Sequence, residues 1–192
     1  MLALTAPCSG ADYAAWATKN PAGVWTRAAE AAVVEAQLPS TNPTDIARFC
    51  PNYQALGHSD RSKFWVGLLS AIARPESGFN PAIRHVERMG DKFENPIISR
   101  GLLQISFGSA KAPRYGCTFI NKAEDLEKAE TNLACGARIL STWVKHDGVI
   151  TNVGAQPSKG GARVWPVLWQ RSDRLPAITK FTRQLPFCGL TK

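Results

Sequence analysis

The chain has 192 residues, of which 44% are hydrophobic and 20% are charged, so it is long enough to bury the core of one domain. This balance excludes a disordered chain, and the sequence contains neither a low-complexity tract nor a repeat at solenoid period. The net charge of +8 favours an anionic partner, such as nucleic acid, a membrane surface or a bacterial cell wall.

Nucleic-acid motifs and membrane spans are both absent from the sequence. The lysines and arginines are scattered, without a long basic run or a pattern of the RRM or zinc-finger kind, so we expect no nucleic-acid partner. No stretch approaches the roughly 18 consecutive apolar residues that a membrane span requires. The opening MLALTAPCSG lacks the charged and apolar regions of a signal peptide, so either the protein is not exported by that route or its leader has been removed.

The five cysteines contain no CxxC pair, which excludes a zinc ribbon and a thioredoxin-type site. We expect neither a metal site nor a cofactor, since the three histidines also lie apart without metal-ligand spacing. The cysteines are predicted to pair as Cys117 with Cys135 and Cys50 with Cys188, which leaves Cys8 unpaired. The alternative is five buried or reduced thiols. Disulfide bonds would place the protein in an oxidising compartment.

The N-terminal part of the chain is predicted to be helical. Residues 20–37 read as one helix, with Asn20 as the N-cap and Pro21 in the first turn. A shorter helical segment follows at about residues 46–53 and is interrupted by Pro51.

The strongest helical pattern begins after GHSD, where Asp60 can cap a helix. Its apolar face carries Phe64, Trp65, Leu68, Leu69 and Ile72. This pattern predicts the buried central helix of the fold. One further i+4 step along the same face leads to Glu76, while Pro75 and Gly78 stop or kink the helix. We therefore expect Glu76 to lie at the end of an apolar face.

The second half of the chain is predicted to combine turns, one extended piece and two helices. Residues 82–100 are polar and turn-rich, and IISRGLLQIS at 97–106 favours a short strand or a buried extended piece. A helix is expected from about Thr131 to the KHDG segment, which ends at Gly148. A final helix is expected on the apolar residues Ile178, Phe181 and Leu185. The fold class is mainly α, with a small β component.

A carboxyl group at the end of an apolar helix face is most often an ordinary, partly exposed residue. In a largely apolar pocket, however, desolvation favours the neutral form and raises the carboxyl pKa toward the working pH. Such a group can donate a proton as a general acid, and cleavage of a glycosidic bond needs that proton on the leaving oxygen.

Three segments carry a family resemblance in their order along the chain: ESGFNP, SRGLLQIS and NLACGARIL. Together they resemble the lytic transglycosylase (SLT) and goose-type lysozyme superfamily over about residues 60–145. In that superfamily an E-S pair closes the central helix, a G-L-M-Q-like segment lines the substrate groove, and an N-hydrophobic-x-x-G helix packs beside it. These elements correspond to Glu76 with Ser77, to residues 101–104, and to Asn132 with Gly136.

The resemblance implies a single lysozyme-like domain over residues 1–192, mainly α (α+β), with a central buried helix and a small β element along a saccharide groove. Residues 1–55 would form an N-terminal helical extension. The implied partner is the glycan strands of peptidoglycan, and we expect a monomer in the periplasm or secreted, from which the signal peptide has been removed. A catalytically inactive peptidoglycan-binding module is the alternative function.

The resemblance also implies roles for individual residues. Glu76 would be the catalytic acid that cleaves the β-1,4 bond between N-acetylmuramic acid and N-acetylglucosamine. The substrate-binding residues would be Ser77, Gln104, Ser106, Asn132 and Trp165. Without the family pattern, Ser77 reads as a helix-end hydrogen bonder and Gln104 as a satisfied core amide. Trp165 is either an aromatic sugar platform or simply a core residue.

Two mechanisms share this fold, and a second carboxylate separates them. A transglycosylase uses Glu76 as acid and then as base to form an anhydro sugar, whereas a hydrolysing lysozyme brings in water. MGD at 89–91 resembles the W-G-D of goose-type lysozymes, so Asp91 is the preferred water-positioning group and Glu87 the next. The alternative is that these carboxylates and Glu94 are solvated loop charges. Hydrolysis is favoured, although Ser106 stands where goose-type lysozymes have their other acid.

Overall fold

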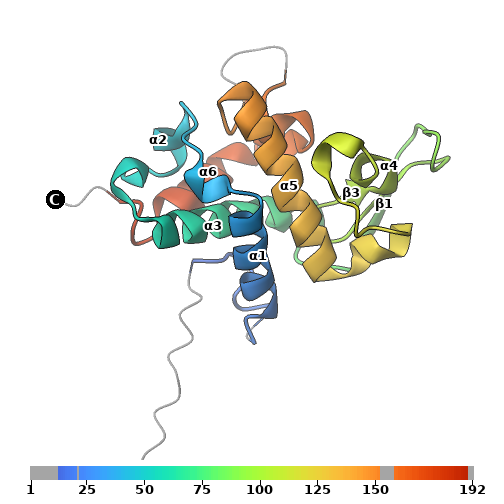
Figure 1. Cartoon of the computed structure of the whole chain (residues 1–192), viewed down its shortest axis with the longest axis horizontal. Coiled ribbons are helices and arrows are strands. Elements are labelled where there is room, and N and C mark those ends of the chain that lie inside the picture. The colour runs from blue at the N-terminus through green and yellow to red at the C-terminus, as the bar shows by residue number, and fades with distance from the viewer. Residues whose placement is uncertain (1–12, 21, 152–157, 190–192) are drawn as a thin grey trace, which may run out of the picture.

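The computed structural model describes residues 13–20, 22–151 and 158–189 (Figure 1). Its α-helices in these ranges are α1 (Val24–Glu35), α2 (Ile46–Phe49), α3 (His58–Ser77), α4 (Phe107–Ala110), α5 (Ala129–Asp147) and α6 (Leu175–Arg183). The strands are β1 (Arg84–Val86), β2 (Ile98–Arg100) and β3 (Ile105–Ser106). The chain is therefore mainly α with one small antiparallel sheet, as predicted. None of the described helices has the length and apolar character needed to cross a membrane.

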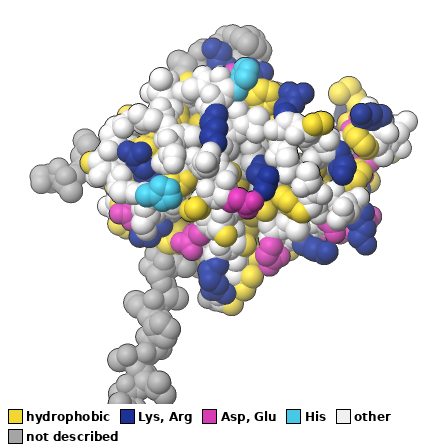
Figure 2. All heavy atoms as spheres, in the orientation of Figure 1, with side chains coloured by type: hydrophobic (Ala, Val, Ile, Leu, Met, Phe, Trp, Pro, Cys, Tyr) yellow, Lys and Arg dark blue, Asp and Glu magenta, His cyan; other side chains and the backbone are white. Residues whose placement is uncertain are grey.

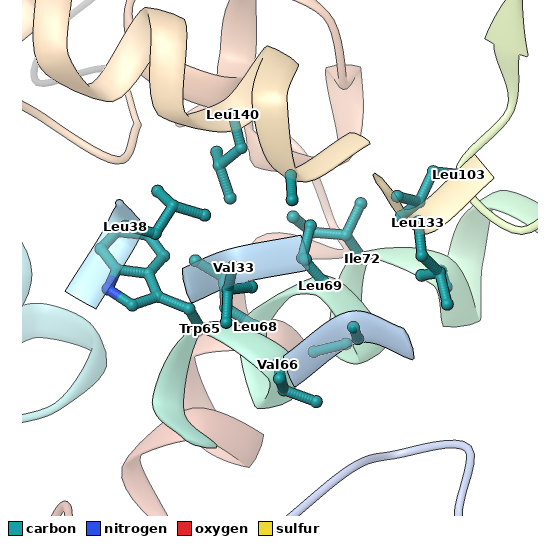
Figure 3. Packing of buried hydrophobic residues seen from close by; sticks show 14 of the residues in the cluster. Val33, Leu38, Trp65, Val66, Leu68, Leu69, Ile72, Leu103, Leu133 and Leu140 are labelled. Atoms are coloured by element: carbon teal, nitrogen blue, oxygen red, sulfur yellow. The ribbon is translucent and has the colours of Figure 1, made fainter. Parts of the chain in front are cut away.

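Helix α3 is the buried centre of the fold. All five residues of its predicted apolar face are fully buried, namely Phe64, Trp65, Leu68, Leu69 and Ile72. Figure 3 shows this face packed against Val33 of α1 and Leu140 of α5. Because contacts from two other helices converge on one side of α3, its position in the core is fixed along most of its length.

Two predicted helix starts are wrong by a few residues. Helix α3 begins after Gly57, and Asp60 lies within its first turn, where it pairs with Lys63 at 2.8 Å. Helix α1 begins after Gly23, whose left-handed backbone (φ 68°) separates the helix from Asn20. Asn20 Oδ1 still accepts a hydrogen bond from the backbone N–H of residue 25, so it satisfies one free helix donor from outside the helix. Pro21 lies outside the described residues.

The N-terminal helical part belongs to the same hydrophobic cluster as the rest of the chain. Helix α1 packs along α5 and also contacts α3, and Figure 1 shows α1 and α5 side by side. Ser141 Oγ donates a hydrogen bond of 2.6 Å to the carbonyl of Ala36, and Arg138 pairs with Glu35 at 2.5 Å. These contacts join the N-terminal and central segments into one packed unit.

Both predicted disulfide bonds are confirmed. Cys50, just after α2, is bonded to Cys188, and Cys117 is bonded to Cys135 of α5. Cys8 lies outside the described residues. The first bond closes a sequence separation of 138 residues and the second one of 18, so the first ties the C-terminal segment to the N-terminal half of the chain.

The sheet lies near α4 at one end of the molecule (Figure 1). Its order is β1–β2–β3, and His85 pairs with Ser99, which in turn pairs with Ser106. Strand β1 was predicted to be part of a polar turn region, because all three of its residues are exposed and show no apolar alternation. Helix α6 is shorter than predicted: it ends at Arg183, and Leu185 is buried just beyond it.

Candidate active site

Glu76 lies in the last turn of α3, as the sequence predicted. The helix continues through Pro75 to Ser77 and ends at Gly78, which adopts a left-handed φ of 58° that suits glycine. Ser77 is buried, and its hydroxyl donates to the carbonyl of Ala73 and accepts from the backbone N–H of residue 79. Ser77 therefore stabilises the helix end that presents Glu76.

The Glu76 carboxyl group is in a state suited to proton donation. Burial, and secondly the negative charge of Glu87, raise the pKa of Glu76 from 4.5 to about 7. Burial acts because removing the carboxyl group from water favours its neutral form over the charged one. Near neutral pH a substantial fraction of the group is therefore protonated, which is the form that a general acid needs.

Glu87, which follows β1, is the carboxylate whose charge acts on Glu76. The hydroxyl of Ser99 on β2 donates a hydrogen bond of 3.0 Å to Glu87 Oε1, and His85 Nε2 lies 4.0 Å from Oε2. The backbone N–H of Glu87 donates to the carbonyl of Ile97, so the residue extends the pairing of β1 with β2. The sheet thus positions a second carboxylate whose charge acts on Glu76 at the end of α3.

Asp91, which the sequence analysis preferred over Glu87, has a different environment. Its Oδ1 accepts hydrogen bonds from the backbone N–H groups of Phe93 and Glu94, at 2.7 and 2.8 Å. Its Oδ2 lies so close to Gly108 of α4 that a Cβ at that position would approach it to 1.9 Å. Asp91 therefore stabilises its own turn by hydrogen bonds and contacts α4. Glu94 pairs with the buried Arg100 at 2.6 Å.

A groove with a volume of 740 Å³ runs between β1 with its following loop on one side and β3 with α4 on the other. It is lined by His85, Val86, Glu87, Arg88, Met89, Ile97, Ser99, Gln104, Ile105, Ser106, Ser109 and Val164. Gln104 has a positive φ of 46°, and its amide donates to the carbonyls of Ile83 and Gly101. Ser106 caps α4 by accepting from the backbone N–H of residue 109. The structure thus brings Glu87, Gln104 and Ser106 into the lining of one groove.

Asn132 and Trp165 do not reach the groove surface. Asn132 is fully buried, and its amide accepts from the N–H of Leu103 and donates to two carbonyls, those of Arg100 and Leu126. Trp165 is 1% exposed, and its indole N–H donates to the carbonyl of Leu103. Both side chains therefore hold the backbone that precedes Gln104 in place, and neither offers a surface to a saccharide.

The transglycosylase SLT domain model matches residues 55–155. The chain belongs to the transglycosylase SLT domain family. Three solved structures of Bd0314 DslA are similar to it over nearly their whole length. The wild-type form 2 has 36% identity and a TM-score of 0.84, and the match covers 92% of this chain and 97% of that one. The other two are glutamate-to-glutamine mutants, each 35% identical with a TM-score of 0.84, covering 92% of this chain and 98% or 97% of theirs. No curated protein matches the chain.

Membership of the SLT family gives the chain a lysozyme-like fold and supports, in general terms, an activity of the lytic transglycosylase type on peptidoglycan. The segments that carried the resemblance in the sequence lie within the matched range. Gly136 of α5 lies close to the segment before Gln104, since a Cβ at this position would approach a Leu103 side-chain carbon to 2.2 Å. The SLT helix α5 and the segment before Gln104 are thus packed directly on each other.

Sequence reasoning missed Ser99 and Arg100, which connect the loop after β1 to β2. Ser99 bonds Glu87, and Arg100, whose side chain is 6% exposed, pairs with Glu94 and lies 3.7 Å from Glu127. Ser99 and Arg100 directly precede the GLLQ segment in the sequence, but their acidic partners become clear only from the register of β1 with β2. A local sequence pattern does not specify that register.

Replacing Asn132 by leucine is expected to lower the free energy of unfolding by about 3 kcal/mol, because it leaves a buried N–H and two buried carbonyls of the SLT core without their partner. Urea denaturation measures this change. Asn121→Leu is a matched control, since the Asn121 side chain is exposed and its substitution is expected to change stability by less than about 0.5 kcal/mol. Equal losses in the two variants would show that Asn132 does not have the structural role described above.

Proposed function

We propose that the protein cleaves the β-1,4 bond between N-acetylmuramic acid and N-acetylglucosamine in peptidoglycan, with Glu76 as the general acid. The observation that carries this proposal is the desolvated carboxyl group at the end of α3, whose pKa of about 7 allows it to hold a proton near neutral pH. Membership of the SLT family supports the substrate class. Glu76 would donate its proton to the oxygen of the leaving sugar as the bond to the anomeric carbon breaks.

Glu87 is proposed as the second carboxylate. It lines the groove, and its charge acts on Glu76. The two mutant forms of Bd0314 DslA replace glutamates that are eleven positions apart in that chain. Glu76 and Glu87 have the same spacing in this chain. The coincidence supports a working pair of glutamates, and the contacts of Asp91 with its own turn favour Glu87 over it.

The proposed reaction is hydrolysis. The ionised Glu87 would accept a proton from a water molecule while the water oxygen bonds to the anomeric carbon, and Glu76 would protonate the leaving oxygen. Gln104 and Ser106 line the same groove and are proposed to contact the saccharide. Ser77 is proposed to support the site indirectly. Its hydroxyl is hydrogen-bonded to the backbone and so stabilises the helix end that carries Glu76.

The setting proposed for this activity is outside the cytoplasm, in the periplasm or secreted. Two disulfide bonds are stable in an oxidising compartment, and peptidoglycan is found there. Lys and Arg side chains are spread over the face shown in Figure 2, and together with the net charge of +8 they favour attraction to an anionic envelope. We propose that the protein acts as a monomer without a cofactor.

Mass spectrometry of the sugars released from purified peptidoglycan tests the reaction. Hydrolysis leaves reducing ends, whereas internal attack by the C6 hydroxyl leaves 1,6-anhydro ends. Reducing ends are the expected result. Anhydro ends would show that Glu76 acts as acid and then base, and they would remove the water-activating role of Glu87. If the protein binds the sacculi but releases no sugar, it is a binding module.

Replacing Glu87 by glutamine is expected to slow cleavage about 100-fold and to move the alkaline limb of the pH–rate profile to lower pH. The direction follows because the negative charge of Glu87 raises the pKa of Glu76, so its removal lets Glu76 lose its proton at lower pH. Clearing rates of purified peptidoglycan over a series of pH values measure both effects. Asp91→Asn is the competing variant, and a larger loss in Asp91→Asn than in Glu87→Gln would restore the preference for Asp91.

A further inference from the structure

Glu87 is held by a single side-chain donor among the described residues. The hydroxyl of Ser99 donates to Oε1 at 3.0 Å, and Ser99 itself is only 9% exposed. Ser99 is the middle residue of β2 and is paired on both sides, with His85 of β1 and Ser106 of β3. The hydroxyl therefore projects from the most constrained position of the sheet, whereas the Glu87 side chain is 42% exposed and has little other support.

The other charged groups around Glu87 do not replace this contact. His85 Nε2 lies 4.0 Å from Oε2, beyond hydrogen-bond distance, and the His85 side chain is 71% exposed. Glu76 of α3 acts on Glu87 by repulsion, and Arg88 lies on the groove wall without a described hydrogen bond or ion pair to Glu87. A hydroxyl that donates to a carboxylate restricts the rotamers of that side chain. Ser99 supplies this contact to Glu87.

We propose that Ser99 is a positioning residue of the site, whose hydroxyl holds the Glu87 carboxylate in the orientation from which its charge acts on Glu76. This inference rests on the proposed function, in which Glu87 works as the charged partner of a protonated Glu76. The two carboxyl groups then differ in environment: Glu76 is desolvated on a helix end, and Glu87 is solvated and hydrogen-bonded on a sheet. Such a difference assigns the acid to one group and the base to the other.

The first test titrates Glu76 without any need for turnover. In the parent protein and in Ser99→Ala, the pKa of Glu76 is measured by NMR of its carboxyl carbon. Removal of the hydroxyl is expected to lower the pKa of Glu76, because the Glu87 carboxylate is then less firmly held where its charge acts on Glu76. An unchanged Glu76 titration in Ser99→Ala would overturn the inference, whatever the protein does to peptidoglycan.

The second test measures cleavage of soluble, peptide-free peptidoglycan glycan chains across pH. Ser99→Ala is expected to lower kcat about tenfold with KM changed by less than about twofold, and to move the alkaline limb of the pH–rate profile to lower pH. The alkaline limb moves because the pKa of Glu76 falls when the charge of Glu87 is less firmly held near it. A uniform loss at every pH with an unmoved profile would contradict the positioning role.

Two further variants separate this role from general damage. In a Glu87→Gln background, Ser99→Ala is expected to have no further effect on rate, because residue 87, the one hydrogen-bond partner described for the Ser99 hydroxyl, no longer carries the charge that Ser99 positions. Ser62→Ala is the matched control, since Ser62 is 7% exposed and its hydroxyl bonds within α3 to His58, about 20 Å before Glu76 along the helix. It is expected to leave the profile and the Glu76 titration unchanged. Additive losses in the double variant would overturn the inference. A parent protein that cleaves nothing would refute the proposed function instead.

Discussion

Glu76→Gln is expected to reduce clearing of purified peptidoglycan about a thousandfold, the largest loss of activity expected from a single substitution in this chain. Glutamine keeps the size of the side chain but cannot give a proton to the leaving oxygen, and the structure describes no second acid at the end of α3 within residues 58–79. Zymography and turbidity of sacculi measure the loss. Equal clearing by Glu76→Gln and the parent would show that Glu76 is not the acid.

Loss of activity in this variant has to be separated from loss of the fold, and stability provides the control. The pKa of Glu76 is raised from 4.5 to about 7 in the folded protein, so above pH 7 the folded state must ionise a group that it disfavours. Glu76→Gln removes that penalty. It is expected to raise the free energy of unfolding by about 2 kcal/mol at pH 8, and the gain should disappear as the pH falls toward 4.5. An inactive but more stable variant at pH 8 is thus the expected result.

The second large effect concerns the Cys50–Cys188 disulfide bond. Replacing both cysteines by alanine is expected to lower the free energy of unfolding by about 5 kcal/mol, because the bond closes 138 residues and removes much of the freedom of the unfolded chain. Both sulfur atoms are also fully buried next to α2 and the end of the chain. Chemical denaturation of the oxidised parent and the double variant measures the difference.

Cys117→Ala with Cys135→Ala is the matched comparison for that experiment. Its disulfide closes only 18 residues, so the same chain-entropy argument gives a smaller loss of about 3 kcal/mol. If removing the bond with the shorter loop lowers the free energy of unfolding more than removing the bond with the longer loop, these bonds do not stabilise the protein mainly by reducing the entropy of the unfolded chain. Peptidoglycan clearing at low temperature is expected to survive both double changes, because neither bond involves a groove residue.

The fold was predictable where its signals are local. The face from Phe64 to Ile72 repeats at the helical period, so the central helix could be read directly, and its continuation led to Glu76. The end of α5 at Gly148 was also predicted from a local signal. Lysine and histidine in the last turn, followed by glycine, are typical of a helix C-terminus. By contrast, β1 is exposed and three residues long, and no period could identify it.

The site was predictable only in part, because sequence patterns name residue types but not the direction of side chains. Gln104 and Ser106 line the groove, whereas Asn132 and Trp165 turn into the core and bond the backbone around Leu103. A polar or aromatic residue in a family motif can face either way, since backbone groups of a buried segment also need partners. The motif therefore identified the segments around the groove, but it did not predict which of their side chains line the groove and which are buried.

The sequence by itself determined the position of Glu76: the 3.6-residue period of α3 and the stop at Gly78 place it at the end of a buried face by local geometry alone. Only the tertiary structure separates the environments of the other two carboxylates. Glu87 and Asp91 are both loop-side acids in the sequence, and the pairing of β1 with β2 brings Glu87 to Ser99, while the turn beyond holds Asp91 against α4. Strand register depends on contacts between distant segments, and for that reason no local pattern could supply it.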